Sequence, residues 1–147
     1  IELLVVIAII GILASVVLAS LSSARSKGAD ANIKANLANA RAQAELFYDT
    51  GSTYTGVCAV GSGTINALVQ GASTTAGAGT VVTALATAGT NTTSVCHESA
   101  SAWAASVPLK SINVVGASSG VDFYCVDSAG ASKVQDAAML ASAVACI

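Results

Sequence analysis

The sequence is poor in charged residues, which make up 10% of its 147 positions. An ordinary soluble domain carries about 25% charged residues, so part of this chain is expected to lie out of water or on a densely packed surface. The net charge is −2, and no cluster of basic residues supplies the positive patch that general nucleic-acid binding requires. The sequence therefore carries no strong nucleic-acid signal.

Residues that perform catalysis are also scarce. The sequence has one histidine, His97, and it contains no nucleophile motif, Gly-rich phosphate loop or close pair of acidic residues. A lone histidine is more often a solvated loop residue than a catalytic base, and we expect His97 to lie in such a loop. We therefore expect a protein that is not an enzyme and that binds no cofactor.

What the sequence has in excess is apolar residues, and they gather at the start of the chain. No charged residue occurs from Leu3 to Leu21, and a helix of that length, at about 1.5 Å per residue, spans a hydrocarbon core of roughly 30 Å. A signal peptide would need a basic region before the apolar run, whereas the first basic residue here is Arg25. We expect residues 1–21 to form a hydrophobic membrane-anchor helix.

An amphipathic pattern follows the apolar run. Neither Gly nor Pro interrupts residues 29–50, and Gly51 stands where a helix C-cap is expected. This pattern predicts a stalk helix over residues 22–50, continuous with the anchor, although an ordinary core helix would show the same stripe. The apolar residues of the stripe recur at spacings of four, three, four and three: Ile33, Leu37, Ala40, Ala44 and Phe47.

The remaining residues, 51–147, are expected to form a globular head. Residues 51–93 are rich in Gly, Ser, Thr and Ala, which predicts loops with one or two short helices. A small antiparallel sheet packed against the stalk helix would allow sheet and helix each to bury an apolar face, so the predicted fold class is α+β. The predicted strands are residues 102–109, 121–126 and 131–135, the last two joined by a turn at Asp127–Gly130.

Two features disagree about the side of the membrane on which the head lies. Arg25 and Lys27 follow the apolar run, and the positive-inside rule alone would place the head in the cytoplasm. The cysteines are even in number and widely spaced, which suits two disulfides in an oxidising compartment and leaves little support for a metal site. We therefore expect a head outside the cytoplasm, with no metal. The four cysteines are Cys58, Cys96, Cys125 and Cys146.

Glu2 is the single charged residue at the edge of the apolar run. A carboxylate in an apolar helix costs on the order of 2.5–3.5 kcal/mol at the bilayer centre, although at the membrane interface the helix macrodipole favours an acid near the helix start. Residues 1–14 read Ile-Glu-Leu-Leu-Val-Val-Ile-Ala-Ile-Ile-Gly-Ile-Leu-Ala. This segment resembles the start of mature type IV pilins and pseudopilins.

The resemblance implies a membrane-anchored subunit that is later extracted into a filament. It implies a leader cut by a prepilin peptidase, insertion in the cytoplasmic membrane, and assembly by a pilus platform into a helical filament of identical subunits at the cell surface. In that family the glutamate that matches Glu2 pairs with the terminal amine of an adjacent subunit, and a buried charge is tolerated when it is paired. The fibre would serve adhesion, motility or DNA uptake. The implied assembly residues are Glu2, Leu3, Leu4, Val5, Ile9, Gly11 and Leu13.

The chain departs from the family pattern in two places. Family members usually carry three more residues, typically Phe-Thr-Leu, before the Ile-Glu pair, so we expect that Ile1 is not the mature terminus. Many pilins also carry a proline about eight residues after the glycine that matches Gly11, where this chain has Ala19. Any unwinding of the helix between Gly11 and Ser20 in a filament would then depend on Gly11 and Ser15.

A second resemblance concerns the head. Trp103 followed by the residues of Tyr124–Gly130 is similar to the C-terminal part of pilin-like proteins from small-genome candidate-phylum bacteria. Many pilins fasten the C-terminus to a sheet strand by a disulfide, which favours Cys58–Cys96 with Cys125–Cys146 among the three connectivities. Asn91 begins a glycosylation sequon, Asn-Thr-Thr, although such triplets also arise by chance in Thr-rich sequence.

Two alternative functions stay open at the level of sequence. A pseudopilin of a type II secretion system would share the anchor and the Glu2 pattern but form only a short, piston-like fibre. A membrane-tethered binding module would use residues 1–21 as an anchor alone, never assemble, and have no need of Glu2.

Overall fold

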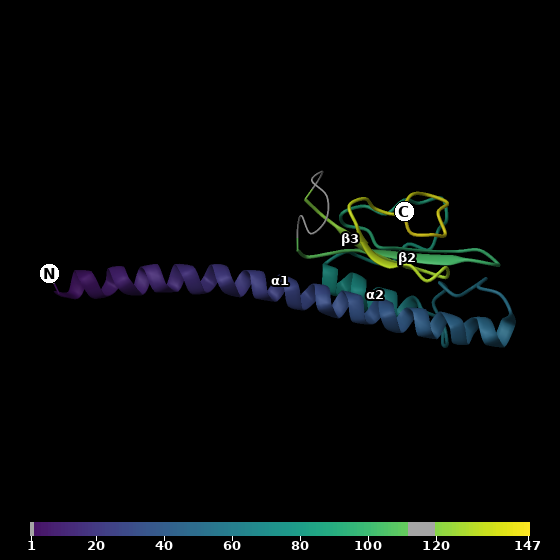
Figure 1. Ribbon diagram of the computed structural model, residues 1–147, viewed down its shortest axis with the longest axis horizontal. Coiled ribbons are helices and arrows are strands. Elements are labelled where there is room, and N and C mark those ends of the chain that lie inside the picture. Colours follow the sequence, from purple (N-terminus) through teal and green to yellow (C-terminus); the bar gives the residue numbers. More distant parts are fainter. Residues whose placement is uncertain (1, 112–119) are drawn as a thin grey trace.

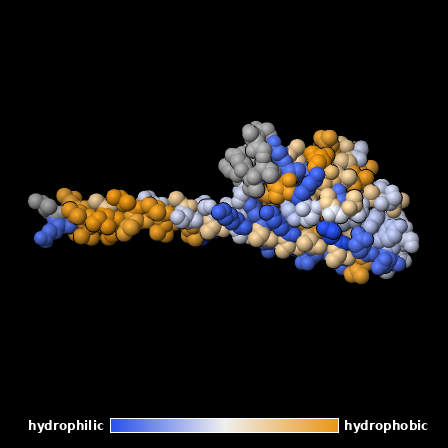
Figure 2. All heavy atoms as spheres, viewed as in Figure 1, coloured by the Kyte–Doolittle hydropathy of each residue, from blue (hydrophilic) through white to orange (hydrophobic). Residues whose placement is uncertain are grey.

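The computed structural model describes residues 2–111 and 120–147. One long helix, α1 (Glu2–Gly51), carries the head along its C-terminal half, and its N-terminal half projects away from the head (Figure 1). The projecting part is hydrophobic over most of its length, between a hydrophilic tip and paler residues next to the head, whereas the head shows a mixed surface (Figure 2). The predicted α+β class is confirmed, because the helix packs against a small antiparallel sheet.

Helix α1 is unbroken over its 50 residues, which corresponds to about 75 Å at 1.5 Å per residue. The expected C-cap at Gly51 is wrong by one residue. Gly51 still belongs to the helix, and the left-handed residue that ends it is Ser52, with φ of 52°. The backbone N–H of Ser52 donates to the carbonyl oxygen of Tyr48 at 2.6 Å, which satisfies one carbonyl of the last turn.

The stripe predicted for the stalk lies in the core of the head. Ile33, Leu37, Ala40 and Ala44 are fully buried, and Phe47 packs against them. Beside α1 lies the short helix α2 (Asn66–Ala76), which ends at Gly77 in the left-handed conformation (Figure 1). The Thr75 hydroxyl on α2 donates to Asn32 Oδ1 on α1 at 3.0 Å, so a hydrogen bond also joins the two helices.

The sheet has four antiparallel strands in the order β1-β2-β3-β4. Three of them, β2 (Trp103–Pro108), β3 (Phe123–Asp127) and β4 (Ser132–Gln135), fall within a residue or two of the predicted strands. The turn between β3 and β4 is confirmed, with Gly130 at φ of 97° and the Ala131 N–H donating to Asp127 Oδ1 at 2.8 Å. β1 (Val95–Glu98) was not predicted.

The two faces of the sheet are covered differently. The face toward α1 and α2 carries Trp103, Ala105 and Val107, which join the main core with Leu37. The opposite face is covered by the C-terminal segment, where Met139 packs with the strand residues (Figure 1). The head therefore has three layers: helices, sheet, and extended segments.

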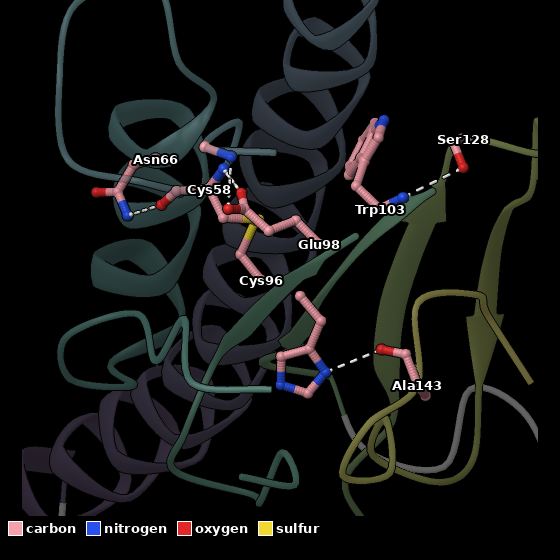
Figure 3. The surroundings of a disulfide bond; sticks show 9 residues. Cys58, Asn66, Cys96, Glu98, Trp103, Ser128 and Ala143 are labelled. Carbon is pink, nitrogen blue, oxygen red and sulfur yellow. Dashed lines mark hydrogen bonds between the residues drawn. A yellow bond between two sulfur atoms is a disulfide. The ribbon is translucent and has the colours of Figure 1, made fainter. Parts of the chain in front are cut away.

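His97 does not lie in an exposed loop, and this prediction is wrong. It is the third residue of β1 and is fully buried. Its ring nitrogen Nδ1 lies 2.9 Å from the carbonyl oxygen of Ala143 (Figure 3). Since a carbonyl oxygen only accepts hydrogen bonds, Nδ1 carries the proton. The ring thus links β1 to the C-terminal segment that covers it.

Two disulfides join the segments that surround the sheet. Cys58 is bonded to Cys96 of β1, and Cys125 of β3 is bonded to Cys146 near the C-terminus. These are the two pairs that the pilin resemblance implies. Beside the first pair, the Glu98 carboxylate accepts the backbone N–H groups of Gly56 and Cys58 (Figure 3), so the loop after α1 is fixed to β1 by covalent and polar contacts.

Candidate functional site

The uncharged N-terminal stretch of α1 forms the most unusual surface of the molecule. We call residues 3–21 the apolar arm. The arm belongs to a helix that is long and apolar enough to cross a membrane. None of the 18-residue apolar stretch of this helix is buried inside the molecule. The core helix of a soluble protein would be mostly buried, so the arm indicates a membrane anchor or a signal sequence.

The arm is apolar on all its sides. Consecutive residues of an α-helix point about 100° apart, so the unbroken aliphatic run from Leu3 to Ile7 already covers the whole circumference. A helix that is hydrophobic all round must be buried by lipid or by other helices, and burying each large aliphatic side chain contributes about 1.5–3 kcal/mol. The large exposed residues of the arm are Leu3, Leu4, Val5, Val6, Ile7, Ile9, Ile10, Ile12, Leu13, Val16, Val17, Leu18 and Leu21.

The arm contains two polar side chains, Ser15 and Ser20. The Ser15 hydroxyl donates to the Ile12 carbonyl oxygen at 2.7 Å, which removes the cost of a free hydroxyl in an apolar medium. Gly11 faces open space, because a Cβ added there would have no atom within 4 Å apart from the neighbouring helix backbone. The helix is continuous here, and the predicted unwinding in an assembled state stays a prediction.

Glu2 lies in the first turn of α1. The nearest basic side chain along the helix is Arg25, 23 positions further, which corresponds to about 35 Å at 1.5 Å per residue. No other charged residue lies between them. A counter-charge for Glu2 among the described side chains of the same molecule is therefore too distant to form an ion pair.

A second apolar surface runs along the stalk, and the sequence analysis missed it. We call it the small-residue face. Its residues are all exposed and lie on the side of α1 opposite the buried stripe, because the two sets are offset by about half a turn. Side chains this small let another helix approach closely. Their recurrence at spacings of four and three was the available signal: Ala24, Gly28, Ala31, Ala35, Ala38 and Ala42.

The sequence-predicted residues fall into three separate places. The assembly residues from Glu2 to Leu13 lie together on the arm, the four cysteines lie in the head, and Asn91 lies in an exposed turn. Within the described ranges, no three His, Cys, Asp or Glu residues are grouped in a way that could hold a metal ion.

Asn91 is the candidate glycosylation site of the head. It lies in a tight turn closed by the Thr93 N–H, which donates to the Thr90 carbonyl oxygen at 3.0 Å, and among the described residues none is bonded to its amide. Intact-mass measurement of protein purified from the cells that make it should show attached sugar. Thr93→Ala removes the sequon hydroxyl and should abolish the added mass, whereas Thr92→Ala keeps the sequon and should retain it. An unmodified mass for the unsubstituted protein would show that the prediction is wrong.

No protein-family model, curated protein or solved structure matches the chain.

Proposed function

We propose that this chain is the structural subunit of a type IV pilus-like extracellular filament. The observation that carries the proposal is the apolar arm, which projects from the head uncovered and apolar on every side. In this proposal the cytoplasmic membrane covers the arm before assembly. The arms of identical subunits cover one another in the filament core afterwards, and the heads lie outside.

The two environments meet the same physical requirement. A lipid bilayer and a bundle of aliphatic helices both surround an all-apolar helix with apolar contacts, so the arm can pass from one to the other without exposure to water. The small-residue face extends this contact surface beyond the arm, because α1 is continuous through Leu21 and Ala24. A neighbouring arm can then pack against the stalk as well as against other arms.

In this proposal Glu2 fixes the axial position of each subunit relative to its neighbours. In the bundle its carboxylate would be buried, which is costly unless a cation of another subunit lies next to it. We propose that the terminal amine of an adjacent subunit supplies that cation, and that a prepilin peptidase and a pilus assembly platform act on the chain before and during assembly. The proposed role is structural and not enzymatic, and His97 supports it because the ring is buried and holds the C-terminal segment.

The two alternatives differ from this proposal in what they assemble. A type II secretion pseudopilin would form short fibres, so abundant long surface fibres of this subunit would exclude it. A membrane-tethered binding module would stay monomeric.

Electron microscopy with helical reconstruction of surface filaments tests the proposal directly. We expect bundled arms in the filament core, and detection of only monomers in the membrane would contradict it.

A charge on the small-residue face should block assembly without unfolding the head. Ala35 is exposed in the middle of that face, so Ala35→Glu should cost little in the monomer but place a desolvated carboxylate between packed helices. We expect filament yield to fall about tenfold or more. The matched control is Ala67→Glu, because Ala67 is an exposed alanine on α2. Equal filament yields for the two variants would exclude this face from assembly.

A further inference from the structure

A cleft of about 720 Å³ lies where α1 leaves the head. Asp30 is the first buried residue of α1, and the cleft is formed around it by the last exposed turns of the helix and by the residues that follow β2. Hydrophilic residues gather at this junction between the arm and the head (Figure 2). The polar residues that line the cleft include Ser23, Ser26, Lys27, Lys34 and Lys110.

The cleft has an excess of positive charge. Its one carboxylate, Asp30, is already engaged, because its oxygens accept the backbone N–H groups of Lys110 at 2.6 Å and of Ser111 at 3.1 Å. The Lys34 ammonium lies 5.6 Å from the centre of the Tyr124 ring. Neither Lys27 nor Lys110 forms an ion pair with any described carboxylate. The three ammonium groups therefore lack an anionic side chain of their own.

The Lys110 side chain has a defined place in this arrangement. Its Nζ lies close to Gly77, where an added Cβ would come within 2.8 Å of it. Gly77 ends α2, and the C-terminal end of a helix favours a cation. Since Asp30 also fixes its backbone, Lys110 is held at the cleft from both sides.

The position of the cleft along α1 places its arm-side end, at Ser23 to Lys27, at the membrane surface. Lys27 follows Leu21 by six residues, which corresponds to about 9 Å along the helix. The headgroup layers extend a bilayer from about 30 Å to about 40–45 Å. This adds about 5–7.5 Å on each side. With the arm in the hydrocarbon core, the hydroxyls of Ser23 and Ser26 therefore lie within the headgroup layer, and the Lys27 side chain, at its outer edge, can reach back to the lipid phosphates. Lys110 and Lys34 lie further from the membrane.

We propose that this cleft binds the phosphate of an anionic phospholipid headgroup while the arm is in the bilayer. The proposal rests on the membrane stage of the proposed function. Ammonium and hydroxyl groups are suitable donors for phosphate oxygens. The positive-inside rule explains lysines on the cytoplasmic side of an anchor, and it does not explain Lys27 if the head lies outside the cytoplasm. Headgroup binding would give Lys27 a function there. It would hold the head at a fixed height above the membrane before assembly.

The test uses the full chain in lipid nanodiscs. Native mass spectrometry after mild detergent release measures how much phosphatidylglycerol and how much phosphatidylcholine stay bound. Each lysine near an anionic surface contributes about fivefold in affinity, so Lys27→Gln should reduce retained phosphatidylglycerol about fivefold. Lys110→Gln removes a charge that lies further from the surface and should reduce it less. Lys133→Gln is the matched control, since Lys133 is an exposed lysine on β4, and it should retain the lipid.

Four results would overturn the proposal. Equal retention of the two lipids, or equal losses in the cleft variants and in Lys133→Gln, would remove the headgroup site and leave the membrane stage standing. Competition by inorganic phosphate alone, with no preference between lipids, would show a site for free phosphate. Failure of the chain to insert into either nanodisc would refute the membrane stage itself. Trp103 fluorescence checks that each variant is folded.

Discussion

Replacing Glu2 with alanine or glutamine is expected to reduce filament yield on the order of 100-fold in cells that lack the unsubstituted subunit. The nearest basic side chain of the same helix, Arg25, is about 35 Å away, so we propose that the counter-charge of Glu2 comes from another subunit. Loss of the carboxylate leaves that partner unpaired among apolar helices, and an unpaired buried charge is strongly destabilising. Filaments sheared from the cells and quantified by immunoblotting measure the effect.

The amount of subunit in the membrane serves as the control for this experiment. Glutamine has no charge and nearly the shape of glutamate, so Glu2→Gln should leave insertion of the arm intact while assembly fails. Glu2→Asp keeps the charge on a shorter side chain and should recover part of the filament yield. Unchanged yield in both Glu2→Gln and Glu2→Ala would contradict a role in assembly and favour the tethered module.

Leu37→Ala is expected to destabilise the head by about 2–5 kcal/mol. Leu37 is fully buried in the cluster that joins α1 to Trp103 and α2, so truncation removes apolar contacts and leaves a cavity between the layers. Trp103 is the only tryptophan of the chain and is fully buried. Its fluorescence, followed during denaturant unfolding of the full chain in detergent, reports the loss directly.

Leu46→Ala is the matched control for the core substitution. Leu46 lies on the same helix but is 59% exposed, and surface substitutions usually change stability by less than about 0.5 kcal/mol. A similar loss of stability in the two variants would mean that the buried stripe does not hold the head to the helix. Neither residue lies on the arm, so a change in unfolding of either variant reports the stability of the head and not the contacts of the arm.

The long helix could be predicted because its signals are local. The apolar run from Leu3 to Leu21 and the stripe that contains Ile33 and Leu37 are periodic patterns that need no knowledge of distant residues. The strands at Trp103 and Phe123 were likewise marked by aromatic and β-branched residues between turns. Each of these segments carries its own pattern over enough residues to distinguish it from a loop.

β1 and His97 could not be read in the same way. Val95, Cys96 and His97 follow a Thr-rich stretch, and four residues are too few to show a clear alternation. They form a strand because Trp103–Ser106 pairs with them on one side and the C-terminal segment covers them on the other. Burial of His97 is therefore a consequence of contacts with Ala143, 46 positions away.

The sequence by itself determined the apolar arm, the stalk stripe and the α+β class, because helix length, periodicity and capping depend on neighbouring residues. Only the tertiary structure decided which surfaces remain uncovered. The arm and the small-residue face are exposed because the head packs along one side of α1 alone, and the cleft exists because Asp30 fixes Lys110 beside Lys27 and Lys34. The contact between Asp30 and Lys110 joins residues 80 positions apart, and such distances close only when the chain folds.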